Sequence, residues 1–138
     1  MRTFQFTVKG NHKNEKGNPV PYTRMTQGTK FSPKALSYAD WKEYVRNTFL
    51  AHCVDQKLLN HEDFRGLVYA LPGLKPIVAS KKKIVMHIMI TFMNDAHADS
   101  DNVFKGIADA LFQNDKYVAG SFDYQYGDAG KVDITIIM

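Results

Sequence analysis

The chain has little of what marks disulfide-rich or membrane proteins. Cys53 is its only cysteine among 138 residues, which excludes an intramolecular disulfide framework and a zinc site built from several cysteines of one chain. The longest apolar run, residues 84–93, holds His87 and Thr91 and has about half the length that a membrane helix requires. The N-terminal segment is too polar for a signal peptide. These absences predict a soluble, cytoplasmic protein with no membrane partner.

Several motifs with known chemistry are also missing. No glutamate follows Asp95, so no EF-hand calcium loop begins at Asp95, Asp99 or Asp101. The chain has no Gly-x-x-x-x-Gly-Lys-Ser/Thr motif, and we expect no nucleotide cofactor. The five histidines never form a paired spacing around an acid, although His97 lies two residues before Asp99.

Charge is distributed unevenly along the chain, whose formal net charge is +4. Residues 1–34 carry seven Lys or Arg residues against one acid, Glu15, whereas residues 95–133 carry eight of the fourteen acidic residues against three lysines. A basic rim around an acidic centre suits a nucleic-acid enzyme, because cations attract phosphates while carboxylates hold a metal ion. On charge alone, a lysine-rich solvated surface explains the pattern equally well.

The first half of the chain predicts a strand, an arm and a helix. Alternating apolar and polar residues predict a half-buried strand over residues 3–9. Residues 10–36 are rich in Gly, Asn, Lys, Thr and Pro, and Pro19, Pro21 and Pro33 exclude a long helix, which predicts an irregular arm. Apolar spacings of three and four predict a helix that begins near Ser37 or Asp40 and ends near residue 53. Residues 55–83 predict only loop or short elements.

The second half predicts two strands around a short helix. Both alternating sets of residues 84–93 are largely apolar, which predicts a central strand covered on both faces. An amphipathic helix follows Asp101, and alternation over residues 132–136 predicts a closing strand. We therefore expect a single α+β domain over residues 1–138, with a mixed sheet of about four strands, one long helix and one short helix.

The central strand leads into a group of residues suited to metal and phosphate chemistry. In an extended segment residues i and i+2 point the same way, so Asp99 and Asp101 can bind one ion. Lys105 lies one helical turn beyond Asp101, and Asp115 could return to the same point from the next strand. Mg²⁺ prefers one or two carboxylates plus water and phosphate oxygens. In phosphodiester hydrolysis, Lys105 would stabilise the charge on the phosphate.

An ordinary structural explanation competes with this one. Asp101 and Lys105 could form an i,i+4 helix ion pair that contributes a few tenths of a kcal/mol, with the two aspartates as helix caps. For an isolated Asp-x-Asp this is the favoured explanation.

Longer stretches of sequence favour the metal site. Residues 99–111 read Asp-Ser-Asp-Asn-Val-Phe-Lys-Gly-Ile-Ala-Asp-Ala-Leu, and residues 114–118 read Asn-Asp-Lys-Tyr-Val. They resemble the signature of the RusA family of Holliday junction resolvases, which is Asp-x-Asp-Asn-x-x-Lys, then Asp-x-Leu, then Asp-Asp-x-x-Val or Ile. Residues 17–24, Gly-Asn-Pro-Val-Pro-Tyr-Thr-Arg, resemble the N-terminal segment of the family, and residues 131–136 its final strand.

The resemblance implies an endodeoxyribonuclease that resolves four-way DNA junctions by paired symmetric nicks, in DNA recombination and repair. Family members are small homodimers, many are encoded by prophages, and they use Mg²⁺, for which we expect Mn²⁺ to substitute. A two-fold dimer suits two symmetric nicks. The metal-binding and catalytic acids would be Asp99, Asp101 and Asp115, and the catalytic lysine Lys105.

The remaining expected site residues support or surround this group. Asn102 and Asp109 would support the site, and Asp109 is four residues beyond Lys105 and could orient it. Backbone phosphates would be held by a set of cationic residues: Arg24, Lys30, Lys34, Lys81, Lys82 and Lys83.

Two departures from the family signature leave alternatives open. Asn114 stands where the family has the first of two aspartates, and the connection from Leu111 to Asp115 is several residues shorter than usual. A junction-binding protein of the same fold with weak or no catalysis is one alternative. A metal-dependent nuclease acting on flaps or single strands is another.

Overall fold

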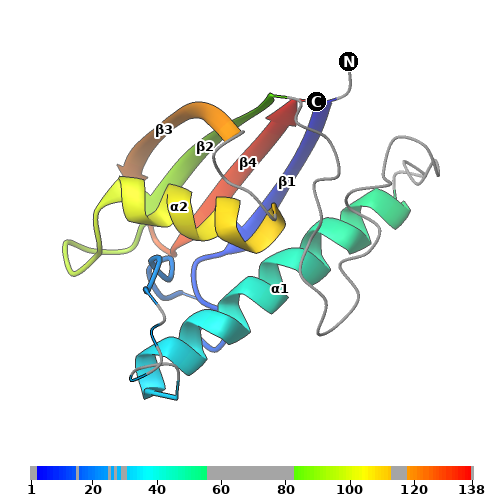
Figure 1. Cartoon of the computed structure of the whole chain (residues 1–138). Helices are drawn as coiled ribbons and strands as arrows, with labels where there is room; N and C mark the ends of the chain where they lie inside the picture. Colours follow the sequence, from blue (N-terminus) through cyan, green and yellow to red (C-terminus); the bar gives the residue numbers. More distant parts are fainter. Residues whose placement is uncertain are drawn as a thin grey trace.

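The computed structural model describes residues 3–14, 16–24, 26, 28, 31–55, 83–112 and 118–137. Along these residues the elements are β1 (Thr3–Lys9), α1 (Pro33–Asp55), β2 (Ile84–Phe92), α2 (Ser100–Leu111), β3 (Val118–Tyr126) and β4 (Lys131–Ile137). The strands form one sheet in the order β1-β4-β2-β3, and both helices lie on one side of it (Figure 1). The predicted α+β domain with a four-stranded sheet, one long helix and one short helix is confirmed.

The sheet is mixed because its strands pair in two directions. β4 pairs antiparallel with both β1 and β2, whereas β3 pairs parallel with β2, with Ile84 opposite Val118 and Phe92 opposite Tyr126. A parallel pair needs a crossover connection, and α2 provides it. β2 and β3 therefore end at the same edge of the sheet, and the chain leaves β2 there to enter the acidic segment.

The core lies between the sheet and the two helices. In β1 the residues alternate between buried and exposed, as predicted, and β4 alternates in the same way. Between them, β2 contributes five buried side chains to the helix side, from Ile84 to Phe92. The largest fully buried side chains of the helices are Tyr38 and Trp41 in α1 and Ile107 and Leu111 in α2.

The other face of β2 departs from the prediction. We expected cover on both faces, but among the described residues no helix packs on the side opposite α1 and α2. On that face His87 is exposed, while Val85 and Met89 are half-buried. Val85 lies between Ile137 of β4 and Ala119 of β3, whereas Met89 lies between Asp133 and Asp123, so this face of the sheet is partly polar.

α1 begins earlier than its predicted start near Ser37 or Asp40. Pro33 occupies the first helical position, where the missing N–H costs nothing and the fixed φ is favourable. The Ser32 hydroxyl accepts a hydrogen bond from Ala35 N at 3.2 Å and caps the helix. Treating Pro33 only as a helix breaker was therefore wrong. Within the described residues, neither helix is long and apolar enough to cross a membrane.

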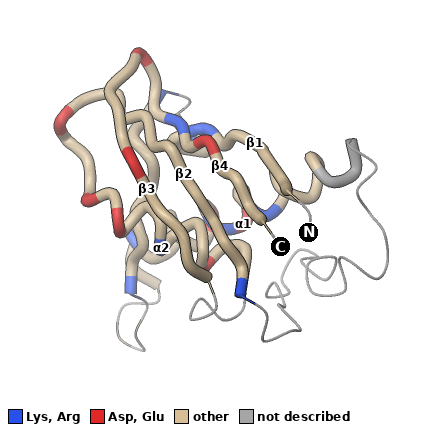
Figure 2. Tube along the Cα trace, turned by 90° about the horizontal axis from the view of Figure 1, so that it is seen from above, with Lys and Arg blue, Asp and Glu red and all other residues tan. Residues whose placement is uncertain are grey.

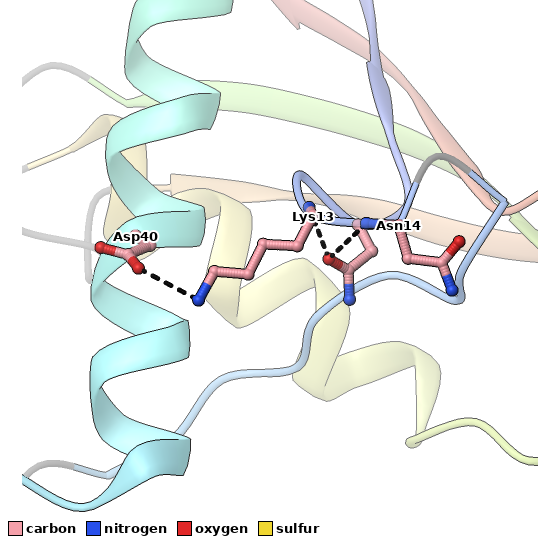
Figure 3. A network of polar contacts seen from close by, with 4 residues as sticks. Lys13, Asn14 and Asp40 are labelled. Carbon is pink, nitrogen blue, oxygen red and sulfur yellow. Dashed lines mark hydrogen bonds and ion pairs between the residues drawn. The ribbon is translucent and has the colours of Figure 1, made fainter.

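The N-terminal arm is anchored against the sheet and α1. Gly10 N donates to Gly130 O at 2.8 Å, where the arm passes the β3–β4 connection. Next to this contact, Asn11 Oδ1 accepts hydrogen bonds from two backbone amides, and Lys13 Nζ lies 3.5 Å from Asp40 Oδ2 of α1 (Figure 3). The predicted arm is irregular but ordered over the residues described. The short elements expected between residues 55 and 83 lie almost entirely outside the described residues.

Candidate metal and nucleic-acid site

Asp99 stands at the junction between the loop after β2 and the start of α2. Its backbone is extended, with φ −62° and ψ 144°, and its carbonyl oxygen accepts hydrogen bonds from Asn102 N and Val103 N. Its side chain makes no capping hydrogen bond and is exposed. The side-chain capping role of the structural explanation is therefore not filled by Asp99, and its carboxylate is left for other partners.

Asp101 and Lys105 lie on α2 itself, one helical turn apart and both exposed. They share a face of the helix, as the sequence spacing predicted. No ion pair joins them in the described part of the chain, where Lys13, Lys42 and Lys131 each pair with an aspartate. The i,i+4 pair of the ordinary explanation is thus not formed.

One geometric argument for a shared ion does not hold. We expected Asp99 and Asp101 to point the same way as members of an extended segment, but α2 begins at Ser100, so Asp101 is already in the first helical turn. The two carboxylates flank the N-terminus of the helix instead. Among the described residues, no three side chains of His, Cys, Asp or Glu gather as a metal site. Two exposed carboxylates with no other use still fit Mg²⁺, which takes few protein ligands and keeps several waters.

The two expected supporting residues bind neighbouring elements. Asp109 Oδ2 accepts a hydrogen bond from Tyr38 OH at 2.6 Å and lies 3.3 Å from Lys42 Nζ, so its carboxylate connects α2 to α1. We expected Asp109 to orient Lys105, but its carboxylate binds Tyr38 and Lys42 instead. Asn102 O accepts a hydrogen bond from Tyr22 N at 3.0 Å, which brings the arm to the first turn of α2.

Asn18 of the arm holds the loop that presents the aspartates. Its Oδ1 accepts a hydrogen bond from Met93 N at 2.6 Å, and its Nδ2 donates to Asn94 Oδ1 at 2.9 Å and to Ala96 O at 3.0 Å. One side chain thus bonds three residues of the loop within four positions. Our sequence reasoning missed Asn18. Its place between Gly17 and Pro19, in the segment resembling the family's N-terminal one, was the available signal.

His97, a residue of the same loop, attaches it to β2 and β3. Its ring stacks on Phe92 at a centroid distance of 3.5 Å and an interplanar angle of 7°. Nδ1 lies 2.7 Å from Ala98 O and therefore donates to it, while Nε2 lies 3.0 Å from Tyr126 OH at the end of β3. Desolvation, followed by the charge and hydrogen bond of Asp95, raises the pKa of Tyr126 above its usual range.

The cationic residues proposed for DNA binding are only partly near the site. Lys34, at the start of α1, helps to line an open pocket together with Asn18 and the loop residues Ala96 to Ala98. Arg24 is exposed two residues after Tyr22, whose N–H donates to Asn102 O in the first turn of α2. Lys83 is exposed at the opposite end of β2. Lys30, Lys81 and Lys82 lie outside the described residues.

Asp115, the third expected acid, also lies outside the described residues, as does Asn114. The positions on either side of the gap are clear. Phe112 follows the last turn of α2, and Val118 opens β3 beside Ile84, at the start of β2. Asp99 follows the other end of β2. Val118 thus lies at the end of β2 opposite to Asp99, so the described residues do not bring the three aspartates together, and their shared metal ion stays a prediction.

Acidic positions gather around β3 and the loops beside it (Figure 2). Asp95, Asp99 and Asp101 follow the end of β2, while Asp128 follows the end of β3 and all four are exposed. Since β2 and β3 end at the same edge, the parallel pairing concentrates negative charge there. Such a region attracts a divalent cation and needs one before it can accept a phosphate.

No model of a known protein family matches the chain, and no curated protein matches it. The resemblance to the RusA family therefore rests on the residues quoted from the sequence.

Proposed function

We propose that the protein is an Mg²⁺-dependent, structure-specific endodeoxyribonuclease that resolves four-way DNA junctions by paired symmetric nicks, acting as a homodimer. The observation that carries the proposal is that, within the residues described, the carboxylates of Asp99 and Asp101 are exposed and are used neither for capping nor for an ion pair with Lys105. Both residues lie where β2 passes into α2. Asp101 stands in the first turn of α2, where the helix dipole favours a negative charge, and both carboxylates are open to a cation.

The chemistry assigns a role to each residue. Asp99 and Asp101 would hold Mg²⁺, with Asp115 as the third acid. The bound ion supplies Lewis-acid polarisation of the phosphate and lowers the pKa of a water ligand. Lys105, one turn further along α2, would donate to the phosphate oxygens as charge develops on them. Arg24 and Lys34 would hold the DNA backbone beside the loop.

The experiment is a cleavage assay with the wild-type protein, a labelled synthetic four-way junction and Mg²⁺. We expect two symmetric nicks, and we expect Asp101→Asn to bind the junction with wild-type affinity but to cut it at least about 100-fold more slowly, because the substitution removes a charged ligand. Asp133→Asn is the matched control, since Asp133 bonds Thr7 and Lys131 on the sheet face opposite the helices. Mn²⁺ should replace Mg²⁺, and a chelator should stop cutting.

The same assay separates the alternatives. A stable complex that is never cut identifies a junction-binding protein without catalysis. Faster cutting of flaps or single strands than of junctions identifies a nuclease of other specificity. If Asp101→Asn cuts the junction at the wild-type rate, the assignment of the site is wrong.

A further inference from the structure

Three aromatic side chains stand half exposed in a row on β3. Phe122, Tyr124 and Tyr126 have exposed fractions of 46%, 52% and 52%. They alternate along the strand, so they share one face, and their partners in β2 are the core residues Ile88, Ile90 and Phe92. That face is the one that carries the helices. Single exposed aromatic residues are common on protein surfaces, but a continuous row of three on one strand indicates a binding surface. We call this row the β3 aromatic ladder.

The ladder is attached to the candidate site at both ends. Phe122 contacts Phe104 of α2 at a centroid distance of 5.9 Å, and Phe104 is adjacent to Lys105 in the sequence. At the other end, Tyr126 OH lies 3.0 Å from His97 Nε2, two residues before Asp99. The ladder therefore runs alongside α2, on the same side of the sheet as the proposed metal ligands.

Pairing with the edge strand of another protein chain is disfavoured. β3 is an edge strand, and such strands pair readily with others unless they are guarded. Asp123 Oδ1 accepts a hydrogen bond from Tyr124 N at 2.8 Å, in the middle of the strand. A partner strand would have to displace this carboxylate and accept a negative charge beside its own backbone. The edge is thus guarded, while the rings on its helix-side face remain open.

We propose that the β3 aromatic ladder is a stacking surface for unpaired nucleobases. Aromatic rings bind bases of any sequence through their faces, and cutting beside a branch point exposes bases that have lost a stacking neighbour. The three rings offer such faces next to the acids that would hold the metal, where phosphates alone would be repelled. The inference rests on the proposed function, because it takes the DNA that is cut at Asp99 and Asp101 as its ligand.

The test measures the affinity of the protein for a fluorescent four-way junction, with Ca²⁺ in place of Mg²⁺ to suppress cutting. We expect Tyr124→Ala to weaken binding roughly tenfold, because base stacking on one ring is lost, and Tyr124→Phe to bind as the wild type does. Gln125→Ala is the matched control, since Gln125 lies on the opposite face of the same strand and bonds Thr91. A 5-iodouracil placed at the branch point should cross-link to the peptide that contains β3.

Failure of this inference differs from failure of the proposed function. If Tyr124→Ala cuts and binds the junction as the wild type does, and no cross-link to β3 forms, the stacking proposal is wrong. The proposed nuclease function is not affected by that result. If the wild-type protein ignores junctions but binds single-stranded oligonucleotides through Tyr124, the ladder stands and junction resolution does not. If Tyr124→Ala lowers the mass in sedimentation and Tyr124→Phe does not, the ladder is a protein interface, and the proposal is wrong.

Discussion

Within the described residues, the carboxylates of Asp99 and Asp101 make neither a capping hydrogen bond nor an ion pair with Lys105. A carboxylate there normally accepts a backbone hydrogen bond or interacts with a cation along the helix. In this protein the carbonyl of Asp99 receives the amides of Asn102 and Val103, and no ion pair joins Asp101 to Lys105 in the described part of the chain. Asp99, Asp101 and Lys105 are therefore not needed to stabilise α2 through these contacts, and they are the residues that we assign to metal and phosphate binding.

His12 makes stability depend on pH. It stacks beside Trp41 and Tyr44, and none of the described residues offers a hydrogen-bond partner to its ring nitrogens. Burial lowers the pKa of His12 below 6.5, although Asp40 opposes the shift. The unfolded chain thus binds the proton more tightly, so stability from the neutral ring is present above about pH 6.5 and is lost as the pH falls through the folded pKa.

We expect the unfolding temperature of the wild type to fall more steeply between pH 7.5 and about 5 than that of His12→Phe, which keeps the ring stacking. Thermal melts across this pH range measure the difference. Parallel curves for the two proteins would contradict the assignment.

Gly120 is required by its surroundings. Its φ is +149°, and an added Cβ would overlap the carbonyl oxygen of Met86 in the neighbouring strand. We expect Gly120→Ala to lower the free energy of unfolding by about 3 kcal/mol, from combined backbone strain and overpacking. Gly28→Ala is the control, since an added Cβ there meets nothing within 4 Å. Chemical denaturation of both variants measures the difference, and equal stabilities would show that β3 can shift away from β2.

At the scale of elements, the loop between β2 and α2 is held between two others. Asn18 fastens it to the arm by three hydrogen bonds, and His97 fastens it to β3 through Tyr126. A loop bound on both sides keeps Asp99 and Asp101 in place before any ligand arrives. Such preorganisation favours catalysis, because small displacements of catalytic groups are costly.

Asn18→Ala should therefore reduce cutting more than binding. We expect the free energy of unfolding to fall by about 1–3 kcal/mol, and the cutting rate of bound junction to fall while the dissociation constant stays near the wild-type value. Asn18→Asp keeps the acceptor for Met93 N but loses both donors. Its cutting rate and its free energy of unfolding should therefore lie between those of the wild type and those of Asn18→Ala. Asn14→Ala, at an exposed position of the same arm, is the control. Single-turnover kinetics separate the two effects, and a loss of affinity alone would assign Asn18 to DNA contact instead.

At the scale of the whole molecule, the helices cover one face of the sheet and leave the acidic site at one edge (Figure 1). One protomer then offers one site, whereas resolution of a junction requires two cuts related by a two-fold axis. The proposed homodimer supplies the second site. We expect the purified protein to sediment as a dimer.

Mixed dimers of wild-type and Asp101→Asn subunits test the symmetry. Each mixed dimer should cut one strand only, so nicked junctions should accumulate in place of resolved duplexes. The control is a mixture of wild-type and Asp133→Asn subunits, which should resolve the junction fully. Full resolution by Asp101→Asn mixtures would show that one site makes both cuts.

Local patterns were sufficient for most of the elements. The strands predicted at residues 3–9 and 132–136, the central strand and the amphipathic helix predicted after Asp101 follow from side-chain periodicity, which is a property of neighbouring residues, and the structure contains all four. The start of α1 was missed because Pro33 was treated as a breaker when it is a favourable first residue. The open face of β2 was missed because the residues beside it come from β3 and β4, far away in the sequence, and several of them are polar.

The sequence by itself determined the fold class, since side-chain periodicity depends on neighbouring residues, and it supplied the candidate site residues through their resemblance to the RusA signature. Only the tertiary structure decided that Asp109 bonds Tyr38 and Lys42 of α1, that Asn18 holds the loop before Asp99, and that three rings of β3 line up beside α2. These contacts join residues far apart in the chain. They depend on the parallel pairing of β3 with β2 and on the path of the arm, which no local periodicity encodes.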